Sequence, residues 1–352
     1  MARSSVQTRV SSNAEPVRRP GSRPPPSLVA PAPVWHCAPV APADYSERLR
    51  GHAREQFARL PPGVRRQVLH GLGRYAPWES GFDFTPPPLG ADEVAGPPDF
   101  VGIGVQKSGT TWWFDLMMSH PELYSRDDIH KERHYFDRFG AAAFEHADLE
   151  GYAGWFPRRP GTVTGEWTPD YFGLPWVPVL LQGAAPDTRL LLLLRDPVER
   201  FRSGLAHRHR LGEATDPPAV NDAIQRGFYH RLLHEWLAYF ERSQILILQY
   251  EKCAADPVGQ LRTTFRFLGL ADCELTTATS SPPLQPRTGV PESSADLDPA
   301  VRRRLVSLYS ADVAKLSRML PDIDLGLWPN FAHLSPGSSE PADGPNSPTR
   351  RP

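Results

Sequence analysis

The chain has 352 residues, which is enough for one α/β domain of roughly 250 residues or for two smaller domains. Its charge is balanced, with 39 basic and 40 acidic side chains, so the whole chain has no field that would attract nucleic acid. Its three cysteines, Cys37, Cys253 and Cys273, lack metal-ligand spacing and cannot all pair. This argues against a zinc site and a disulfide framework, and we expect a reduced protein of the cytoplasm.

The sequence does not indicate a membrane protein. Its longest strongly apolar run, Leu190 to Leu194, is far shorter than the roughly 20 residues of a membrane span. The N-terminus carries arginines but no apolar segment of the kind found in secretion signals. We therefore expect neither membrane insertion nor secretion.

Proline marks the two ends of the chain. Residues 1–44 are rich in Pro, Arg and Ser and have few large apolar side chains, so they cannot bury enough surface to offset the entropy of ordering. We expect a disordered leader over residues 1–44 and a disordered tail over residues 334–352. Between the leader and the core, residues 45–98 are expected to form a helical N-terminal extension and a connector, with two short helices interrupted at Pro61-Pro62.

The first element of the core is a strand over Phe100 to Val105, because this apolar run contains β-branched residues and reads as a buried parallel strand. A turn rich in Gly, Ser and Thr follows, and the apolar residues from Thr111 to Met118 predict a buried helix. A strand, a glycine-containing loop and a helix in this order are typical of the start of a nucleotide-binding α/β unit.

A second unit begins with the strand Arg189 to Leu194. Asp196 at the N-cap, followed by Pro197 and Glu199, predicts a helix start immediately after it. Further along, an apolar stripe from Phe228 to Phe240 predicts an amphipathic helix. A third strand is expected over 245–248, and a helix from Asp256-Pro257 to about Leu268.

The loop after the first strand, Gly104 to Thr111, combines backbone N–H groups, Lys107 and hydroxyl groups at a helix N-terminus, which favours the binding of an anion. The loop is not a Walker motif, because Lys107 comes before Gly109. A glycine-rich turn without a ligand is the alternative. An NTP-dependent kinase-like phosphotransferase would also need a magnesium-binding carboxylate, and Asp196 is the one candidate.

Four motifs in order resemble the family of sulfotransferases that use 3′-phosphoadenosine 5′-phosphosulfate (PAPS), more in its heparan-sulfate and bacterial branch than in its phenol and steroid branch. The motifs are the loop 104–113, the segment 131–137, the segment 165–172 and the segment 194–203. The resemblance spans about residues 99–333, which we expect to be the sulfotransferase domain. It implies an α/β, P-loop-like, three-layer fold with a central parallel sheet flanked by helices.

The resemblance also implies the chemistry. The sulfuryl group would pass from PAPS to a hydroxyl, or less readily an amine, of a sugar, phenol or natural-product acceptor, releasing adenosine 3′,5′-bisphosphate without a metal. Lys107 would neutralise charge on the leaving phosphate oxygen. Arg195 and Ser203 would hold the 3′-phosphate, and Tyr229 would contact the adenosine, with packing on a helix face as its alternative role. The remaining residues implied to bind PAPS are Ser108, Gly109, Thr110, Thr111 and Trp112.

On the acceptor side, Glu132 matches the catalytic carboxylate of the family and is our candidate for the base. If residues 131–137 are extended, Glu132, His134 and Phe136 share one side of the chain, so His134 would support the base or orient the acceptor. The alternative is a surface salt bridge and an ordinary loop histidine. His207 lies one helical turn after Ser203 and matches a histidine near the active site of the heparan-sulfate branch.

Two features remain open in the sequence. Many aromatic residues lie between the motifs and either line an acceptor pocket or belong to the core, as most of them are expected to do: Trp112, Trp113, Tyr135, Phe136, Trp155, Phe156, Trp167, Tyr171, Phe172 and Trp176. Only Arg287-Thr288-Gly289 resembles a loop that closes over the nucleotide. A non-catalytic nucleotide-binding module is a further alternative to an enzyme, although Lys107 and Glu132 are both present.

Overall fold

The computed structural model describes residues 64, 85–212, 215–273 and 296–335, all within one unit that begins at Pro62. The expected leader, the two helices expected around Pro61-Pro62, the proposed closing loop at Arg287 and the tail beyond residue 335 lie outside these residues.

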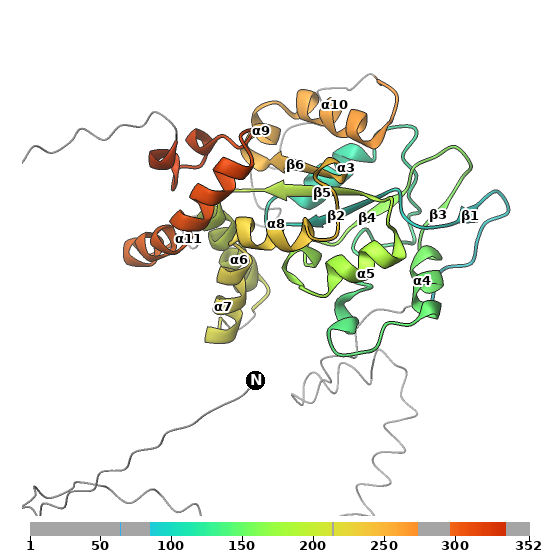
Figure 1. Cartoon of the computed structure of the whole chain (residues 1–352), viewed down its shortest axis with the longest axis horizontal. Helices are drawn as coiled ribbons and strands as arrows, with labels where there is room; N and C mark the ends of the chain where they lie inside the picture. Colours follow the sequence, from blue (N-terminus) through green and yellow to red (C-terminus); the bar gives the residue numbers. More distant parts are fainter. Residues whose placement is uncertain (1–63, 65–84, 213–214, 274–295, 336–352) are drawn as a thin grey trace, which may run out of the picture. The chain divides into compact units, whose positions relative to one another are not determined.

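A four-stranded parallel sheet in the order β4-β2-β5-β6 forms the centre of the described part (Figure 1). Its strands are β2 (Phe100–Gly104), β4 (Gly165–Trp167), β5 (Arg189–Leu194) and β6 (Ile245–Gln249). A separate two-stranded antiparallel sheet pairs β1 (Val94–Ala95) with β3 (Pro157–Arg158). The three expected strands and the parallel sheet are confirmed, whereas the short strand β4 was not predicted.

Helices cover both faces of this sheet. The α-helices are α3 (Thr110–Met117), α4 (His146–Ala153), α5 (Val177–Ala184), α6 (Pro197–Arg210), α7 (Pro217–Gln225), α8 (Tyr229–Trp236), α9 (Tyr250–Ala255), α10 (Pro257–Leu268) and α11 (Pro299–Met319). Short 3-10 helices occur at η1 (Asp137–Gly140), η2 (Tyr171–Gly173), η3 (Arg242–Gln244), η6 (Leu325–Leu327) and η7 (Ala332–Leu334). No helix in the described ranges has both the length and the apolar character needed to cross a membrane.

The leucine run of β5 shows why the fold has three layers. All five leucines are buried, and alternate ones point to opposite faces of the sheet. Leu190, Leu192 and Leu194 pack in one apolar cluster with residues of α5, α6, α8 and α11. Leu191 and Leu193 pack in a second cluster with α3 and α10, which lie on the other side of the sheet in Figure 1. The expected three-layer α/β fold is therefore confirmed.

The Trp167 side chain at the end of β4 lies directly against the backbone of Gly102 in β2. A Cβ atom on Gly102 would lie 2.1 Å from Trp167 Cγ, so only glycine fits at that position. The indole Nε1 donates to the carbonyl of Gly104 at 3.2 Å. This contact fixes the end of β4, and with it the turn that begins at Thr168, beside the end of β2.

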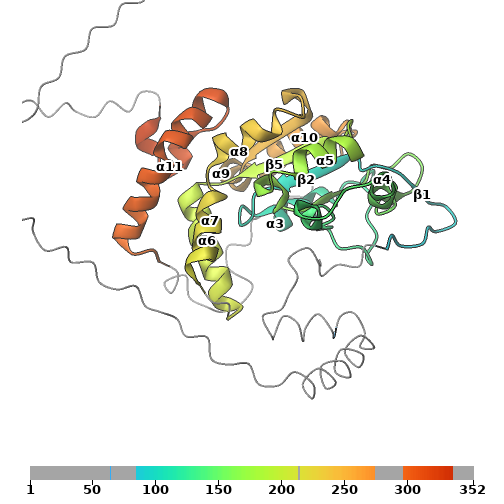
Figure 2. The same ribbon diagram turned by 60° about the horizontal axis from the view of Figure 1, so that its bottom comes forward.

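Helices begin where strands end. α3 follows β2, α6 follows β5 and α9 follows β6, which gathers three helix N-termini at the carboxyl edge of the sheet. The predicted start of α6 is confirmed, because the Asp196 carboxylate accepts from the backbone N–H groups of Val198 and Glu199. α11, which was not predicted, packs against α6 and α8 (Figures 1 and 2).

The predicted helix along the Phe228 stripe is shorter than expected. α8 ends at Trp236, and the chain turns there because the backbone N–H groups of Tyr239 and Phe240 both donate to the Trp236 carbonyl. Phe240 is nevertheless buried against the core. The apolar stripe therefore continues into a turn, where periodicity alone does not mark the end of the helix.

Candidate active site

The loop between β2 and α3 presents hydrogen-bond donors at the carboxyl edge of the sheet. Gly109, with φ of 85°, is the N-cap of α3 and offers no side-chain acceptor. The first backbone N–H groups of a helix have no acceptor within it, and the helix dipole there favours an anion. Ser108 is fully buried, and its Oγ has no hydrogen-bond partner. An anionic oxygen would satisfy both Oγ and these N–H groups.

Lys107 and Arg195 meet at this loop from two neighbouring strands. Lys107 has a left-handed backbone, with φ of 66°, and its carbonyl accepts from Arg195 Nη1 at 3.2 Å. A Cβ atom on Gly204 of α6 would lie 3.9 Å from Lys107 Cγ, so the aliphatic part of the lysine lies near that helix. Two cationic residues and a helix N-terminus therefore belong to one site.

Tyr250 is a site residue that sequence analysis missed. The Arg195 guanidinium lies over its ring, 4.7 Å from the centroid, and the Tyr250 ring makes an edge contact with Trp112 at 6.0 Å. A Cβ atom on Gly109 would come within 2.8 Å of the same ring. Tyr250 thus joins the loop to Arg195. It directly follows β6, and that position at a strand end was the signal that could have revealed it.

Ser203 and Tyr229 support this group differently. Ser203 is half-buried in α6, next to Gly204, and remains our prediction for a 3′-phosphate ligand. Tyr229 is fully buried, and its hydroxyl donates to the carbonyl of Arg195 at 2.9 Å. Burial also raises the pKa of Tyr229. Tyr229 therefore holds the backbone of Arg195 from within the core, and its expected contact with the adenosine stays a prediction.

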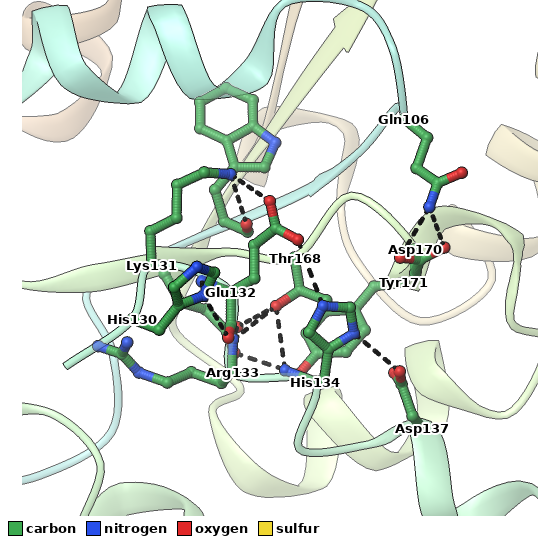
Figure 3. Close-up of polar contacts among 12 residues, drawn as sticks. Gln106, His130, Lys131, Glu132, Arg133, His134, Asp137, Thr168, Asp170 and Tyr171 are labelled. Atoms are coloured by element: carbon green, nitrogen blue, oxygen red, sulfur yellow. Dashed lines mark hydrogen bonds and ion pairs between the residues drawn. The ribbon is translucent and has the colours of Figure 1, made fainter. Parts of the chain in front are cut away.

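Glu132 lies between two cationic partners (Figure 3). Lys131 Nζ donates to Glu132 Oε1 at 2.5 Å, and His134 Nε2 is 3.3 Å from Glu132 Oε2. The other ring nitrogen of His134, Nδ1, is 2.8 Å from Asp137 Oδ2. An imidazole that faces a carboxylate at each nitrogen donates to both when it is protonated. Glu132, His134 and Asp137 thus form one chain of polar contacts.

These contacts determine the charges of Glu132 and His134. Burial alone would raise the pKa of Glu132, but its bond to His134 and the charge of Lys131 lower that pKa to about 2. Burial alone would lower the pKa of His134, but its bonds to Asp137 and Glu132 raise that pKa to about 10. At neutral pH Glu132 is therefore a carboxylate and His134 an imidazolium.

The expected side-chain alternation along residues 131–137 is only partly correct. Glu132 and His134 do lie together, but Lys131 also contacts Glu132, although it was placed on the opposite side. Phe136 is fully buried in the core. The reason is that the segment is not a strand: His134 has a left-handed backbone, with φ of 51°, which breaks the alternation of side chains.

Thr168, just after β4, anchors this irregular segment. Its Oγ1 accepts from the backbone N–H of Arg133 at 2.9 Å and from that of His134 at 3.3 Å. The same hydroxyl donates to Glu166 Oε2 at 2.5 Å. Glu166 is fully buried, and burial raises its pKa. The motif that contains Thr168 was found in the sequence, but its role was not predicted.

One polar contact joins the loop to the acid–base residues. Gln106 Nε2 donates to Asp170 Oδ1 at 2.8 Å and to Oδ2 at 3.0 Å (Figure 3). The negative charge of Asp170 also contributes to the raised pKa of His134. Lys107 and His134 therefore belong to neighbouring parts of one site.

Three other predicted residues lie on the helices α3 and α6. Thr110 is buried and Thr111 is exposed in the first turn of α3. His207 is half-exposed on α6, and its Nδ1 is 3.3 Å from Arg210 Nη2. Its role in catalysis stays a prediction.

Most of the aromatic residues between the motifs are core residues, as expected. Trp112, Trp155 and Trp176 are partly exposed. The seven others are buried: Trp113, Tyr135, Phe136, Phe156, Trp167, Tyr171 and Phe172.

Asp196, the candidate magnesium ligand, has its oxygens occupied. It accepts from the N–H groups of Val198 and Glu199 and from both the backbone N–H and the side-chain amide of Asn330. The carboxylate is fully buried, so a cation would have to displace these donors. Among the described residues, no group of three or more His, Cys, Asp or Glu side chains has the arrangement of a metal site.

The chain is similar to known proteins. A family model described as "Sulfotransferase domain" matches residues 97–281. Heparan sulfate glucosamine 3-O-sulfotransferase 6 of Mus musculus is 31% identical over 264 residues, covering 70% of this chain and 64% of the relative. Heparan sulfate glucosamine 3-O-sulfotransferase 3B1 of Mus musculus is 32% identical over 190 residues, covering 49% of this chain and 46% of the relative. The chain thus spans about half to two thirds of the length of these relatives.

Among solved structures, a sulfotransferase from Alicyclobacillus acidocaldarius is similar with a TM-score of 0.48 and 23% sequence identity, covering 66% of this chain and 98% of that one.

Proposed function

This chain belongs to the sulfotransferase domain family, and from that premise we propose that it transfers a sulfuryl group from PAPS to a saccharide hydroxyl. The meeting of Lys107 and Arg195 beside the N-terminus of α3 carries the proposal. PAPS is a polyanionic nucleotide with a phosphosulfate group at the 5′ position and a phosphate group at the 3′ position. A protein that binds it needs two separate anion-binding sites, and the residues at the ends of β2 and β5 supply them.

The residues of this chain fit such a co-substrate. The unpartnered Oγ of buried Ser108 and the N–H groups at the start of α3 offer donors to the 5′-phosphosulfate. The Tyr229 hydroxyl holds the backbone of Arg195, and the guanidinium group of Arg195 stacks on the Tyr250 ring. That guanidinium can donate charge-assisted hydrogen bonds to the 3′-phosphate. Ser203 is the second candidate ligand of that phosphate.

PAPS, when bound, supplies the sulfuryl group and a leaving phosphate oxygen on which negative charge develops. Lys107 stabilises that charge, because a preorganised cation next to a developing anion lowers the barrier. Glu132 receives the proton of the acceptor. Its carboxylate is paired with Lys131 and His134 in the free site, so the acceptor hydroxyl must replace one of these donors when it binds.

The choice of a saccharide acceptor rests on the curated relatives, whose names specify the 3-O position of glucosamine in heparan sulfate. A more distant relative is the bifunctional heparan sulfate N-deacetylase/N-sulfotransferase 4 of Mus musculus, which sulfates nitrogen. We therefore propose a sugar hydroxyl as the acceptor before an amine. The cytoplasmic location expected from the cysteines stays a prediction.

The direct test is sulfate transfer from PAPS to a panel of acceptors that includes glucosamine-containing oligosaccharides, simple glycosides and phenols. We expect transfer to a saccharide and release of adenosine 3′,5′-bisphosphate in equal amounts. Transfer to phenols alone would reject the saccharide acceptor but keep the reaction. No transfer to any acceptor, with adenosine 3′,5′-bisphosphate still bound, would favour a non-catalytic nucleotide-binding module.

The second candidate function, NTP-dependent phosphotransfer, is not favoured. It needs a carboxylate for magnesium, and the oxygens of Asp196 already accept four hydrogen bonds. Activity that is lost with EDTA and restored by magnesium would support this alternative. Transfer that is unchanged by EDTA supports sulfuryl transfer.

A further inference from the structure

The turn from Thr168 to Tyr171 contacts both halves of the site, which are the donor half around Lys107 and the acceptor half around Glu132 and His134. It follows β4, the edge strand that Trp167 fixes against β2. We propose that this turn is a shared positioning element, which holds Lys107 through Gln106 and His134 through the Thr168 and Tyr171 hydroxyls. The proposal rests on the proposed function, because it assumes that Lys107 grips the donor and that His134 acts beside Glu132.

The first observation is where the backbone is strained. Among the described residues, the non-glycine residues with positive φ are Lys107, at 66°, and His134, at 51°. A left-handed backbone costs energy in any residue with a side chain, so it persists only where the surroundings hold it. In the proposed reaction, both of these residues act through a charged side chain. Something in the structure must therefore hold each of them.

For His134, the holding groups are two hydroxyls of the turn. Thr168 Oγ1 accepts from the N–H of His134 at 3.3 Å, and Tyr171 OH accepts from the N–H of Tyr135 at 2.8 Å. The two bonds fix the peptide groups on both sides of the left-handed residue. The His134 ring is thereby directed to Glu132 and Asp137, as Figure 3 shows.

For Lys107, the holding group is Asp170. Gln106 directly precedes the lysine, and its amide donates to both oxygens of Asp170. Asp170 is itself fixed by an ion pair with Arg226, which also pairs with Asp222. On the other side of Lys107, Arg195 donates to its carbonyl. Two contacts therefore hold the left-handed backbone of Lys107: the hydrogen bonds of the preceding Gln106 side chain and the hydrogen bond to the Lys107 carbonyl.

Gln106→Leu tests the donor half. The substitution keeps the size of the side chain and the Asp170–Arg226 pair but removes the tether. We expect the affinity for adenosine 3′,5′-bisphosphate, measured by titration calorimetry, to fall about tenfold. Asp222→Asn is the matched control, because it disturbs the other contact of Arg226 and leaves the tether in place. Unchanged affinity in Gln106→Leu would overturn this half. If the wild type itself does not bind the nucleotide, the proposed function fails instead.

Thr168→Val tests the acceptor half without any substrate. It keeps the shape of the residue but removes the acceptor for the His134 N–H. We expect the pKa of His134, followed by NMR and assigned with His134→Gln, to fall toward its ordinary value as the ring leaves its partners. The charged groups around that ring are Glu132, Asp137 and Asp170, with Lys131 beyond Glu132.

Thr168→Ser restores the hydroxyl and should restore the pKa of His134. Because Thr168 is fully buried, Tyr171→Phe provides a second variant that removes the neighbouring anchor while keeping the ring. It should lower the same pKa. A folded Thr168→Val or Tyr171→Phe protein in which His134 titrates as in the wild type would overturn the positioning role of the turn.

Discussion

The donor and acceptor halves of the site are built in opposite ways. The donor half, Lys107 to Thr111 with Arg195, lies on strand ends and helix starts, and much of its grip comes from backbone N–H groups. The acceptor half, residues 131–137, has no helix or strand before Asp137, where η1 begins, and is held by side-chain hydroxyls. Backbone N–H groups are present whatever side chain a residue carries, so a phosphate site built from them depends less on individual side chains. An acid–base group held by side chains can be altered one contact at a time.

Lys107→Ala should have the largest effect on turnover. Loss of a preorganised cation at the leaving oxygen costs about 10²- to 10³-fold in kcat. Initial rates with saturating PAPS and acceptor measure this effect. Lys252→Ala is the control, because Lys252 Nζ donates to the Asp322 carbonyl away from the loop. Wild-type turnover in Lys107→Ala would show that the donor half works without its lysine.

Glu132→Gln removes the candidate base of the acceptor half and keeps its shape. We expect turnover to fall by about 10²-fold, with little change in the binding of adenosine 3′,5′-bisphosphate. Glu150→Gln, at an exposed position of α4, is the control. Near-normal turnover would reject Glu132 as the base and make His207 the next candidate, because His134 is already protonated.

Arg195→Ala should reduce the preference of the protein for a nucleotide with a 3′-phosphate over one without it, in addition to any effect on turnover. A charge-assisted contact to the 3′-phosphate contributes roughly 2 kcal/mol, which is about 30-fold in relative affinity. The measurement compares adenosine 3′,5′-bisphosphate with adenosine 5′-monophosphate in the variant and in the exposed control Arg304→Ala. Unchanged discrimination would reject Arg195 as the ligand without rejecting PAPS.

The His134–Glu132 pair should make stability depend on pH. Because the pKa of His134 is raised from 6.5 to about 10, its contribution is complete below 6.5 and is lost as the pH rises to about 10. Because the pKa of Glu132 is lowered from 4.5 to about 2, its contribution is complete above 4.5 and is lost as the pH falls to about 2.

His134→Gln should therefore cost the most unfolding free energy between pH 4.5 and 6.5, roughly 1 kcal/mol after solvent screening. Urea denaturation of the wild type and the variant at about pH 6 and about pH 9.5 measures this difference. An equal difference at both pH values would show that His134 is not held as an imidazolium.

His207→Ala should have the smallest effect. His207 is half-exposed and contacts Arg210, so we expect turnover to change by less than about threefold. A loss comparable to that of Glu132→Gln would place His207 among the catalytic residues and extend the acceptor half onto α6.

The same contrast between the two halves explains what the sequence revealed. β5 was predicted residue for residue, because a run of leucines buried on both faces has few other interpretations. The start of α6 followed from Asp196-Pro197, a local signal. β4 is only three residues long and has no such signal, so it was missed. α11 has a helical apolar stripe at Leu305, Tyr309, Val313 and Leu316, so it was predictable, although it was not predicted.

In the site, the pairing of Glu132 with His134 was predicted from side-chain alternation, but the backbone there is a left-handed turn rather than a strand. The anchors of that turn, Thr168 and Tyr171, act across 34 to 36 residues of sequence. Contacts of this kind depend on how β4 packs on β2, which no local pattern encodes. Tyr250 was missed although its position directly after the strand β6 could have revealed it.

The binding of adenosine 3′,5′-bisphosphate and adenosine 5′-monophosphate to the wild-type protein tests the central claim most directly. Arg195 is part-buried, and its Nη1 already donates to the Lys107 carbonyl. A site built for PAPS leaves the other donors of this guanidinium without their anionic partner when the 3′-phosphate is missing, which lowers the affinity. We predict that calorimetric titration finds the bisphosphate bound at least about 30-fold more tightly than the monophosphate. Equal affinities would contradict the assignment of PAPS as the donor.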